Sequence, residues 1–353
     1  MLSLALAVLV GFAASTIRVP LAWVLGPLLA TAACSMLGAS IFAPTTGRRF
    51  GQAVVGTSVG LYVTAESLGT IASWLPAIVA TALVAMLCAA LLSVPLARAG
   101  RIDHKTAFFS LTPGGLSEMA NVGIKAGAQP EPIALSQALR VALLVCVMPP
   151  LIVALGIDGE LNSSGENVQL TWAESSTALL CGMAGVTFAR LLRFNNPWTV
   201  GAIIGAAALS TGGVVSGRMP GILMAFGQFL IGISIGARFR REGLARLPRL
   251  FMLSAAFIVL LTAILFGYAA ALSAMTGLDL ASAALGASPG GMAEMALTAQ
   301  VLHLNVTLVT AFHVVRAFLV NAFTLHFFGV VERLGLFRAA EALLDRCSGR
   351  RSR

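Results

Sequence analysis

Residues 113–120 read P-G-G-L-S-E-M-A and residues 289–296 read P-G-G-M-A-E-M-A, so the motif P-G-G-x-x-E-M-A occurs twice at an offset of 176 residues. A second motif, F-G-Q-x-x-x-G-x-S-x-G, occupies residues 50–60 and recurs at the same offset at residues 226–236. Two motifs in one register indicate an internal duplication. We therefore divide the chain into a first repeat, residues 1–156, an acidic connecting loop, residues 157–175, a second repeat, residues 176–332, and a basic C-terminal tail, residues 333–353.

The composition places these repeats in a membrane. Hydrophobic residues make up 58% of the chain and charged residues only 10%, whereas about a quarter of the residues of a soluble domain are charged. The net charge of +9 does not indicate nucleic-acid binding, because Lys and Arg collect in the cytoplasmic loops of membrane proteins. We expect no nucleic-acid partner, and we expect membrane lipids to contact the chain.

Each repeat contains five apolar stretches that are long enough, or nearly so, to cross a bilayer, which takes about 20 residues. The predicted spans are residues 2–17, 20–43, 50–65, 70–97 and 131–155 in the first repeat, and 176–192, 197–216, 221–237, 250–274 and 305–330 in the second.

The P-G-G segments, near residues 106–127 and 282–302, lie between the fourth and fifth spans. Pro and Gly interrupt a helix, and irregular backbone at membrane depth is tolerated only inside protein or beside a water-filled cavity. These segments are therefore predicted to be re-entrant hairpins or broken helices.

The distribution of charge favours hairpins that enter and leave on one side. Five spans per repeat then give inverted repeats, with both termini and the cluster Arg238–Arg249 in the cytoplasm and the acidic loop outside. Full crossing would give six spans per repeat and place that cluster outside, against the positive-inside rule. The sequence thus predicts an all-α polytopic protein of a bacterial-type inner membrane, with two inverted-topology repeats of about five transmembrane helices plus one re-entrant or broken P-G-G segment each.

Inverted repeats with interrupted helices are a known transporter design, whose binding site lies near the midplane where the interruptions meet. Glu118 and Glu294 follow the breaks by three residues. An acid in lipid is costly and usually functional, so these residues are predicted to bind a coupling cation or carry a proton. The alternative is a helix-capping acid.

Arg140 and Arg316 lie in the middle of apolar spans. They are predicted to neutralise the glutamates or to bind a carboxylate or phosphate substrate, and the alternative is a structural ion pair. One turn earlier, His313 is a candidate proton carrier or a hydrogen-bonded structural residue. Gln52 and Gln228 are predicted to pair across helices or to line the path. The full predicted substrate and ion site is Pro113, Gly114, Gly115, Glu118, Arg140, Pro289, Gly290, Gly291, Glu294, Arg316, Gln52, Gln228 and His313.

Two kinds of enzyme chemistry are disfavoured. The G-x-S-x-G strings at residues 56–60 and 232–236 match a hydrolase nucleophile elbow, which needs a strand, a turn and a helix, but they lie in helical runs and have the spacing of close helix packing. The four histidines lack metal-ligand spacing, and no C-x-x-C pair occurs among the five cysteines. We expect no enzyme activity, no metal and no cofactor.

The doubled P-G-G-x-x-E-M-A and F-G-Q-x-x-x-G-x-S-x-G motifs resemble those of the AbrB membrane-protein family, which also carries the label ammonia monooxygenase. The resemblance covers essentially the whole chain. It implies an inner-membrane protein with a duplicated domain, linked by label to the regulation of gene expression and by architecture to transport. The monooxygenase label disagrees with this sequence, because a copper or iron site needs clusters of His or carboxylate.

The function that the sequence favours is secondary transport of a small solute or ion, with an anion among the options and a proton or sodium as the coupling ion. A membrane regulator that affects gene expression through a cytoplasmic partner is the alternative, and a membrane monooxygenase is disfavoured. A homodimer stays open.

Overall fold

The computed structural model describes residues 2–339 apart from residues 18, 40, 155–168, 195, 216, 240, 243–246, 336 and 338. Most of the predicted acidic loop, part of the Arg238–Arg249 cluster and nearly all of the C-terminal tail lie outside the described residues. Within the described part the chain is helical, and its extended structure is limited to an isolated bridge between Gln169 and Arg218.

Each predicted span corresponds to one helix, and each P-G-G segment forms two short helices. The first repeat contains α1 (Leu2–Thr16), α2 (Ala22–Met36), α3 (Thr45–Gly60), α4 (Ala65–Gly100), α5 (His104–Leu111), α6 (Leu116–Lys125) and α7 (Pro130–Ala154). The second contains α8 (Trp172–Leu191), α9 (Pro197–Thr211), α10 (Gly221–Gly236), α12 (Pro248–Thr276), α13 (Leu280–Ala287), α14 (Met292–Val301) and α15 (Val306–Arg333).

Four of these helices, α4, α7, α12 and α15, are long and apolar enough to cross a membrane. The helices α1, α2, α9 and α10 are also apolar but shorter. A helix rises 1.5 Å per residue, so the 15 residues of α2 extend for only about 22 Å. The chain therefore has the helices of a membrane protein.

Several boundaries differ from the predicted spans: α2 ends at Met36 rather than near residue 43, and α3 and α4 begin at Thr45 and Ala65 rather than near residues 50 and 70. Helix α8 begins at Trp172, so the connecting loop is shorter at its C-terminal side than predicted. The cause is a capping box: the Glu174 N–H donates to Thr171 Oγ1 at 3.3 Å, and the Thr171 N–H donates to Glu174 Oε2 at 2.8 Å. This arrangement satisfies two free donors at the start of the helix.

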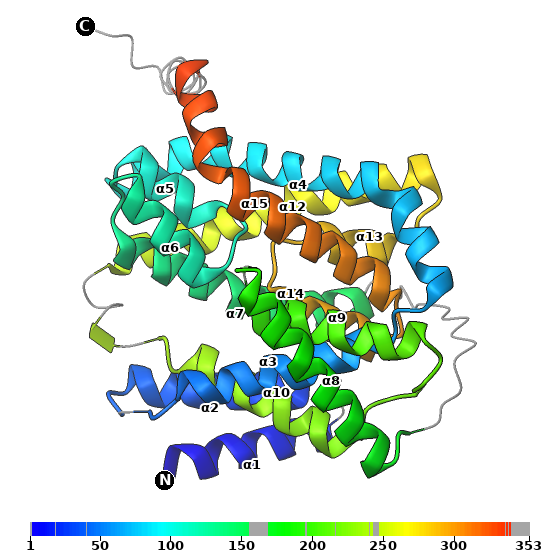
Figure 1. The fold of residues 1–353 in the computed structure, drawn as a ribbon. Helices are drawn as coiled ribbons and strands as arrows, with labels where there is room; N and C mark the ends of the chain where they lie inside the picture. Colours follow the sequence, from blue (N-terminus) through cyan, green and yellow to red (C-terminus); the bar gives the residue numbers. More distant parts are fainter. Residues whose placement is uncertain are drawn as a thin grey trace, which may run out of the picture.

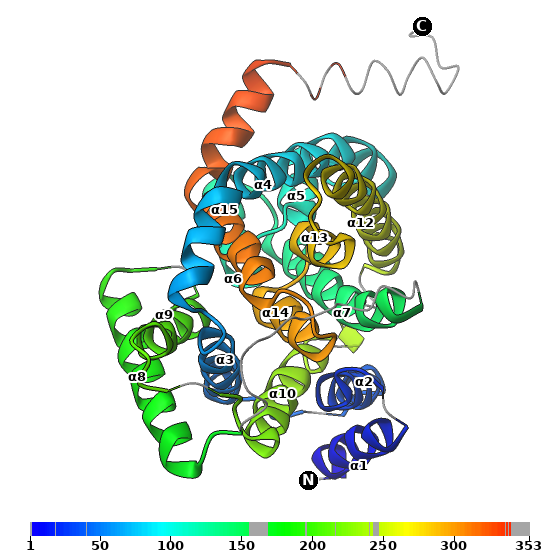
Figure 2. The same ribbon diagram turned by 90° about the vertical axis from the view of Figure 1, so that its right-hand side faces the viewer.

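The helices separate into two groups that mix the two repeats. The scaffold group contains α1–α3 and α8–α10, and it occupies the lower part of Figure 1. The hairpin group contains α4–α7 and α12–α15, and it occupies the upper part. Figure 2 shows the same division from the side, with α3, α10 and α14 near the boundary.

Glycines set the close packing of the scaffold group. A Cβ on Gly185 of α8 would lie 2.1 Å from the Gly201 carbonyl oxygen of α9, and a Cβ on Gly26 of α2 would lie 2.5 Å from Gly11 Cα of α1. The Ser-containing motif follows the same rule, because a Cβ on Gly60 would lie 2.5 Å from the Ile203 carbonyl oxygen. This confirms the prediction that the G-x-S-x-G strings pack helices rather than form a nucleophile elbow.

Helices α4 and α12, which are equivalent in the two repeats, run antiparallel. Thr81 Oγ1 lies 3.3 Å from Tyr268 Oη, and Gly100, at the end of α4, faces Leu250, near the start of α12. Since α5 follows the end of α4 and α13 follows the end of α12, the two P-G-G segments start at opposite ends of this helix pair. In Figure 1, α5 and α6 lie near one end of α4, whereas α13 lies near the other end.

Both P-G-G segments return to the end at which they began. In the first, the Gln129 N–H donates to Thr106 Oγ1 at 2.9 Å. In the second, the Asn305 N–H donates to Ser282 Oγ at 3.3 Å. We call α5–α6 the first hairpin and α13–α14 the second hairpin.

Candidate functional site

The break in the first hairpin is held by side chains from α7. Arg140 donates from Nη1 to the Thr112 carbonyl oxygen at 2.9 Å and from Nη2 to the Gly114 carbonyl oxygen at 2.7 Å. Gln137, one turn earlier, donates from Nε2 to the Phe109 and Thr112 carbonyl oxygens at 2.8 and 2.9 Å. These carbonyls have no partner within a helix because α5 ends here, so α7 supplies the missing donors.

The second hairpin repeats this arrangement at the same offset. Arg316 donates from Nη1 to the Ser288 carbonyl oxygen and from Nη2 to the Gly290 carbonyl oxygen, the latter at 2.8 Å. The ring of His313 takes the place of Gln137: its Nε2 lies 3.0 Å from the Leu285 carbonyl oxygen. The sequence did not predict these contacts, because the partners are backbone dipoles.

The arginine contacts differ from the predicted pairing with glutamate. Among the described residues, neither Arg140 nor Arg316 forms an ion pair with Glu118 or Glu294, since their terminal nitrogens bind carbonyls. Both guanidinium groups are buried, with 2% of Arg140 and 5% of Arg316 exposed. A charged donor to a buried carbonyl contributes more than a neutral one, which accounts for an arginine at this depth.

The contacts of His313 fix its tautomer. Its Nδ1 lies 2.8 Å from Arg316 Nη2, which can only donate. Nδ1 therefore accepts, and Nε2 carries the proton that it donates to the Leu285 carbonyl oxygen. A second proton on Nδ1 would set two donors face to face, so the structural alternative fits this ring better than the proton-carrier prediction.

Glu118 and Glu294 fold back over the first turns of α6 and α14. A Cβ on Gly115 would lie 2.1 Å from Glu118 Oε2, and a Cβ on Gly291 would lie 2.0 Å from Glu294 Oε2. Each carboxylate thus occupies the space that the N-cap glycine leaves free. An acid in the first turn is favoured there by the positive end of the helix dipole. Only 7% of Glu294 is exposed.

A cavity of about 630 Å³ lies between the scaffold and hairpin groups and joins both breaks. Every predicted site residue lines it except Pro289 and Gln228. The predicted lining residues are Gln52, Pro113, Gly114, Gly115, Glu118, Arg140, Gly290, Gly291, Glu294, His313 and Arg316. The two repeats therefore contribute to one space, as inverted-repeat transporters require.

Four arginines outside the predicted site also line this cavity. They are Arg48, Arg49, Arg190 and Arg238. Arg49 and Arg190 are exposed, so the cavity reaches the surface at the ends of α3, α8 and α10 where these residues lie. We call this end the arginine mouth. Their positions in the sequence could have pointed to the site. Arg48 lies two residues before the first F-G-Q motif, and Arg238 lies two residues after the end of the second.

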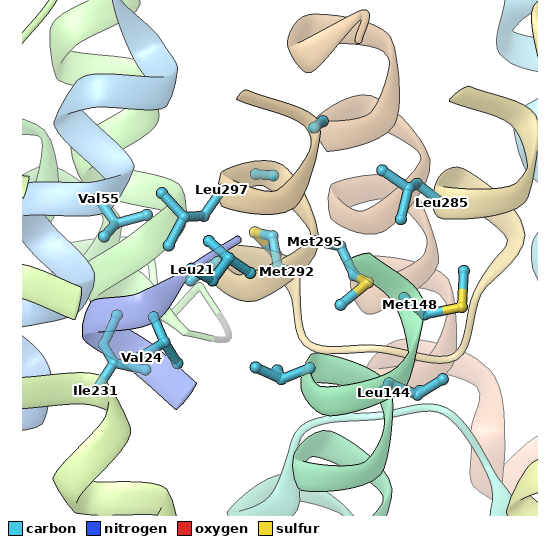
Figure 3. Packing of buried hydrophobic residues seen from close by; sticks show 14 of the residues in the cluster. Leu21, Val24, Val55, Leu144, Met148, Ile231, Leu285, Met292, Met295 and Leu297 are labelled. Atoms are coloured by element: carbon cyan, nitrogen blue, oxygen red, sulfur yellow. The ribbon is translucent and has the colours of Figure 1, made fainter. Parts of the chain in front are cut away.

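The opposite end of α3 is closed by the second hairpin and α15. Gln300 Nε2 donates to Tyr62 Oη at 3.2 Å and to Ser58 Oγ at 3.3 Å. Thr307 Oγ1 donates to the Tyr62 carbonyl oxygen at 2.9 Å. Figure 3 shows Leu297 of α14 beside Val55 of α3, within one buried apolar cluster. The structure is therefore open at the arginine mouth and packed at the Tyr62 end.

Comparison with known proteins identifies the family. A family model described as "Transition state regulatory protein AbrB" matches residues 23–332. The chain belongs to the AbrB family. A Bacillus subtilis (strain 168) protein named "Uncharacterized protein YhjN" is 27% identical over 348 residues, which cover 92% of this chain and 91% of the relative. An Escherichia coli (strain K12) protein named "Putative regulator AbrB" is 28% identical over 321 residues, which cover 89% and 90% of the two chains.

The match to the AbrB family spans both hairpins, both F-G-Q motifs and every residue that lines the cavity, from Ile41 to Asn321. The resemblance inferred from the paired motifs is thus confirmed. The printed names of the family and of the Escherichia coli relative refer to regulation, and neither names a substrate.

Proposed function

We propose that this AbrB-family protein is a secondary transporter that moves a small solute through the cavity by alternating access. The observation that carries the proposal is that one cavity joins the two P-G-G breaks and, among the described residues, is open at the arginine mouth while the Tyr62 end is packed. Interrupted helices from two repeats that meet at a shared site are the pattern of inverted-repeat transporters.

The helix directions support inverted repeats. Equivalent helices α4 and α12 run antiparallel, and the two hairpins start from opposite ends of that pair. Helices α3 and α10 are equivalent in the two repeats, and they cross at equivalent glycines: a Cβ on Gly51 would lie 2.6 Å from the Gly227 carbonyl oxygen. We place the arginine mouth and both termini in the cytoplasm, because basic residues concentrate on that side.

The difference between the two repeats indicates how the other state forms. Gln300, Ser58, Tyr62 and Thr307, which close one end, correspond at the repeat offset to Ile124, Ser234, Arg238 and Glu131. Ile124 is 54% exposed, and Ser234 and Arg238 line the open cavity. If the repeats exchange their conformations, α6 packs on α10, Ile124 approaches Ser234, and Glu131 approaches Arg238. The arginine mouth then closes while the Tyr62 end opens.

Glu118 and Glu294 are the proposed coupling residues. Each carboxylate lies over the N-terminus of its own helix, a position that also favours an anionic ligand. A proton or sodium ion that neutralises the carboxylate would weaken its hold on that helix end and leave the end free for a solute. Cation and solute would then favour each other's binding, which is the requirement for coupled transport.

A regulatory role is the second candidate, favoured by the family's description as a transition state regulatory protein. It needs a cytoplasmic partner, and the basic segments suited to that contact lie largely outside the described residues. Transport and regulation are distinguished by whether the cavity changes the side to which it opens.

Two disulfide pairs test the proposal in a variant whose native cysteines are replaced. Ser58→Cys with Gln300→Cys should lock the present state, because those side chains are already in contact. Ile124→Cys with Ser234→Cys should lock the opposite state, since a disulfide needs Cα atoms within about 7 Å. A reporter cysteine at Val141 should react with an impermeant maleimide only from the cytoplasmic side in the first lock, and only from the outside in the second, because Val141 and its counterpart Ala317 both line the cavity.

Each lock should also abolish the exchange by which the unlocked protein reacts with the reagent from both sides. Failure of the Ile124–Ser234 pair to cross-link in the bilayer, with both cysteines accessible to reagent, would show that the mouth does not close, and the transport proposal would fall. Ile124→Cys with Arg333→Cys is the matched control, because Arg333 lies at the exposed end of α15 and does not line the cavity.

A further inference from the structure

The charge of the cavity is unbalanced. Six arginines and two glutamates line it, which leaves four positive charges without a carboxylate in the lining. The described residues contain no ion pair between these arginines and any Asp or Glu. Positive charge gathered without counter-charge is unfavourable where burial limits its solvation, because no carboxylate compensates it there.

Two of the arginines are held together on one aromatic ring. The guanidinium carbons of Arg49 and Arg190 lie 5.8 and 6.0 Å from the centre of the Trp198 ring. Such cation–π contacts hold each side chain in place, yet they also bring two like charges from α3 and α8 to one site. A structural role would need only one of them.

Arg238 experiences the same excess of charge deeper in the cavity. Its pKa is lowered to about 10, chiefly by burial and next by the positive charge of Arg48. The carboxylates of Glu118 and Glu294 act in the opposite direction without cancelling these effects. Arg238 remains charged at neutral pH, and it lies close enough to Arg48 and to the glutamates of both breaks to be affected by their charges.

We infer that the solute is an oxyanion, with carboxylate or phosphate groups, which enters at the arginine mouth and binds between Arg48 and Arg238. The planar guanidinium group matches both oxyanions through paired N–H donors. A bound dianion would balance much of the excess charge. The inference names the solute class for the proposed transport and so rests on it, but binding is testable without measuring flux.

An anionic lipid headgroup has the same chemistry and could lie at a cytoplasmic mouth. The volume of about 630 Å³ and the glutamates at its inner end favour a free anion, because the cavity continues past the arginines to the two breaks. A headgroup tied to acyl chains would stop at the mouth.

The test uses Ser234→Cys in the full chain with its native cysteines replaced, purified in a neutral detergent. Two small thiol reagents are compared, the anionic sulfonatoethyl and the cationic trimethylammonioethyl methanethiosulfonate, each corrected for its rate with free cysteine. A cationic cavity concentrates anions by tenfold or more, so the anionic reagent should react at least about tenfold faster. Arg238→Gln should remove most of that preference, and Arg333→Gln, outside the cavity, should keep it.

Protection then distinguishes the source of the anion. At constant ionic strength, succinate or inorganic phosphate should slow labelling of Ser234→Cys relative to chloride, and Arg238→Gln should abolish the protection. Protection by phosphatidylglycerol alone would assign the arginines to lipid and overturn the inference. Equal rates for both reagents, with no protection by any anion, would overturn it as well. In either case the disulfide experiment on Ile124 and Ser234 would still decide the transport proposal.

Discussion

Replacing Arg140 should destabilise the protein because it removes the donors that satisfy the first break. The side chain makes two charge-assisted hydrogen bonds, to the Thr112 and Gly114 carbonyl oxygens. A hydrogen bond to a charged group contributes about 1.5–3 kcal/mol. Arg140→Ala should therefore lower the free energy of unfolding by about 3–6 kcal/mol, plus a contribution from the cavity that it leaves.

Arg140→Met separates hydrogen bonding from packing, because methionine fills much of the same space and donates no hydrogen bond. It should still cost about 1.5–3 kcal/mol, because the Gly114 carbonyl loses its charged donor. The Thr112 carbonyl keeps Gln137 Nε2 and the Gly114 N–H as donors. Unfolding is measured by denaturant titration in mixed micelles, with the thermal midpoint as a second readout. Arg333→Ala, at an exposed site, should change stability by less than about 0.5 kcal/mol.

The reasoning would be refuted if Arg140→Met were within about 1 kcal/mol of the unaltered protein. Arginine would then act only by filling space, and the Gly114 carbonyl would have another donor. Arg316→Met should behave like Arg140→Met, because its two carbonyl contacts are the same.

Two further predictions concern the acids and the helix packing. The double variant Glu118→Gln, Glu294→Gln should keep its thermal midpoint and insertion but lose flux driven by a proton or sodium gradient in vesicles; full flux would reduce both residues to helix caps. Gly185→Ala should cost about 1–3 kcal/mol by overpacking, because its Cβ would lie 2.1 Å from the Gly201 carbonyl oxygen. Gly267→Ala, which meets nothing within 4 Å, should instead stabilise α12 by up to about 1 kcal/mol, and the two variants are compared by thermal unfolding.

Much of the fold could be predicted from the sequence because its signals are local. Apolar length and Pro-Gly-Gly breaks are properties of short segments, and the helices do break at residues 112–115 and 288–291 as predicted. The repeat offset then fixed which helices correspond. The start of α8 was predicted too late because Thr171 and Glu174 were assigned to the loop rather than to a cap.

The site was harder to predict because its main partners are backbone atoms. The motif placed Glu118 and Arg140 in one space, and the cavity lining agrees with that. Opposite charges at one depth indicated an ion pair. Arg140 instead binds backbone carbonyls that are free to accept a hydrogen bond because α5 has ended. No side-chain pattern records where an unpaired carbonyl lies. The mouth arginines were missed for a different reason: the positive-inside rule already accounted for them.

The hydrogen bonds of the breaks belong entirely to the hairpin group, and this bears on how the two groups can move. Arg140 and Arg316 bind carbonyls of the two breaks from α7 and α15, so each break is stabilised by a helix of its own group. Within the described part of the chain, the side-chain hydrogen bonds between the two groups come from Gln300 and Thr307 at the Tyr62 end. The two hairpins have equivalent arginine hydrogen bonds at their breaks. Their surroundings differ, because Gln300 of the second hairpin contacts Ser58 and Tyr62, whereas its counterpart Ile124 in the first hairpin is exposed. The internal structure of a hairpin does not decide which end is open. What differs is the contact with the scaffold, and weak polar contacts such as Gln300 to Tyr62 can be exchanged without breaking the strong bonds of Arg140 and Arg316.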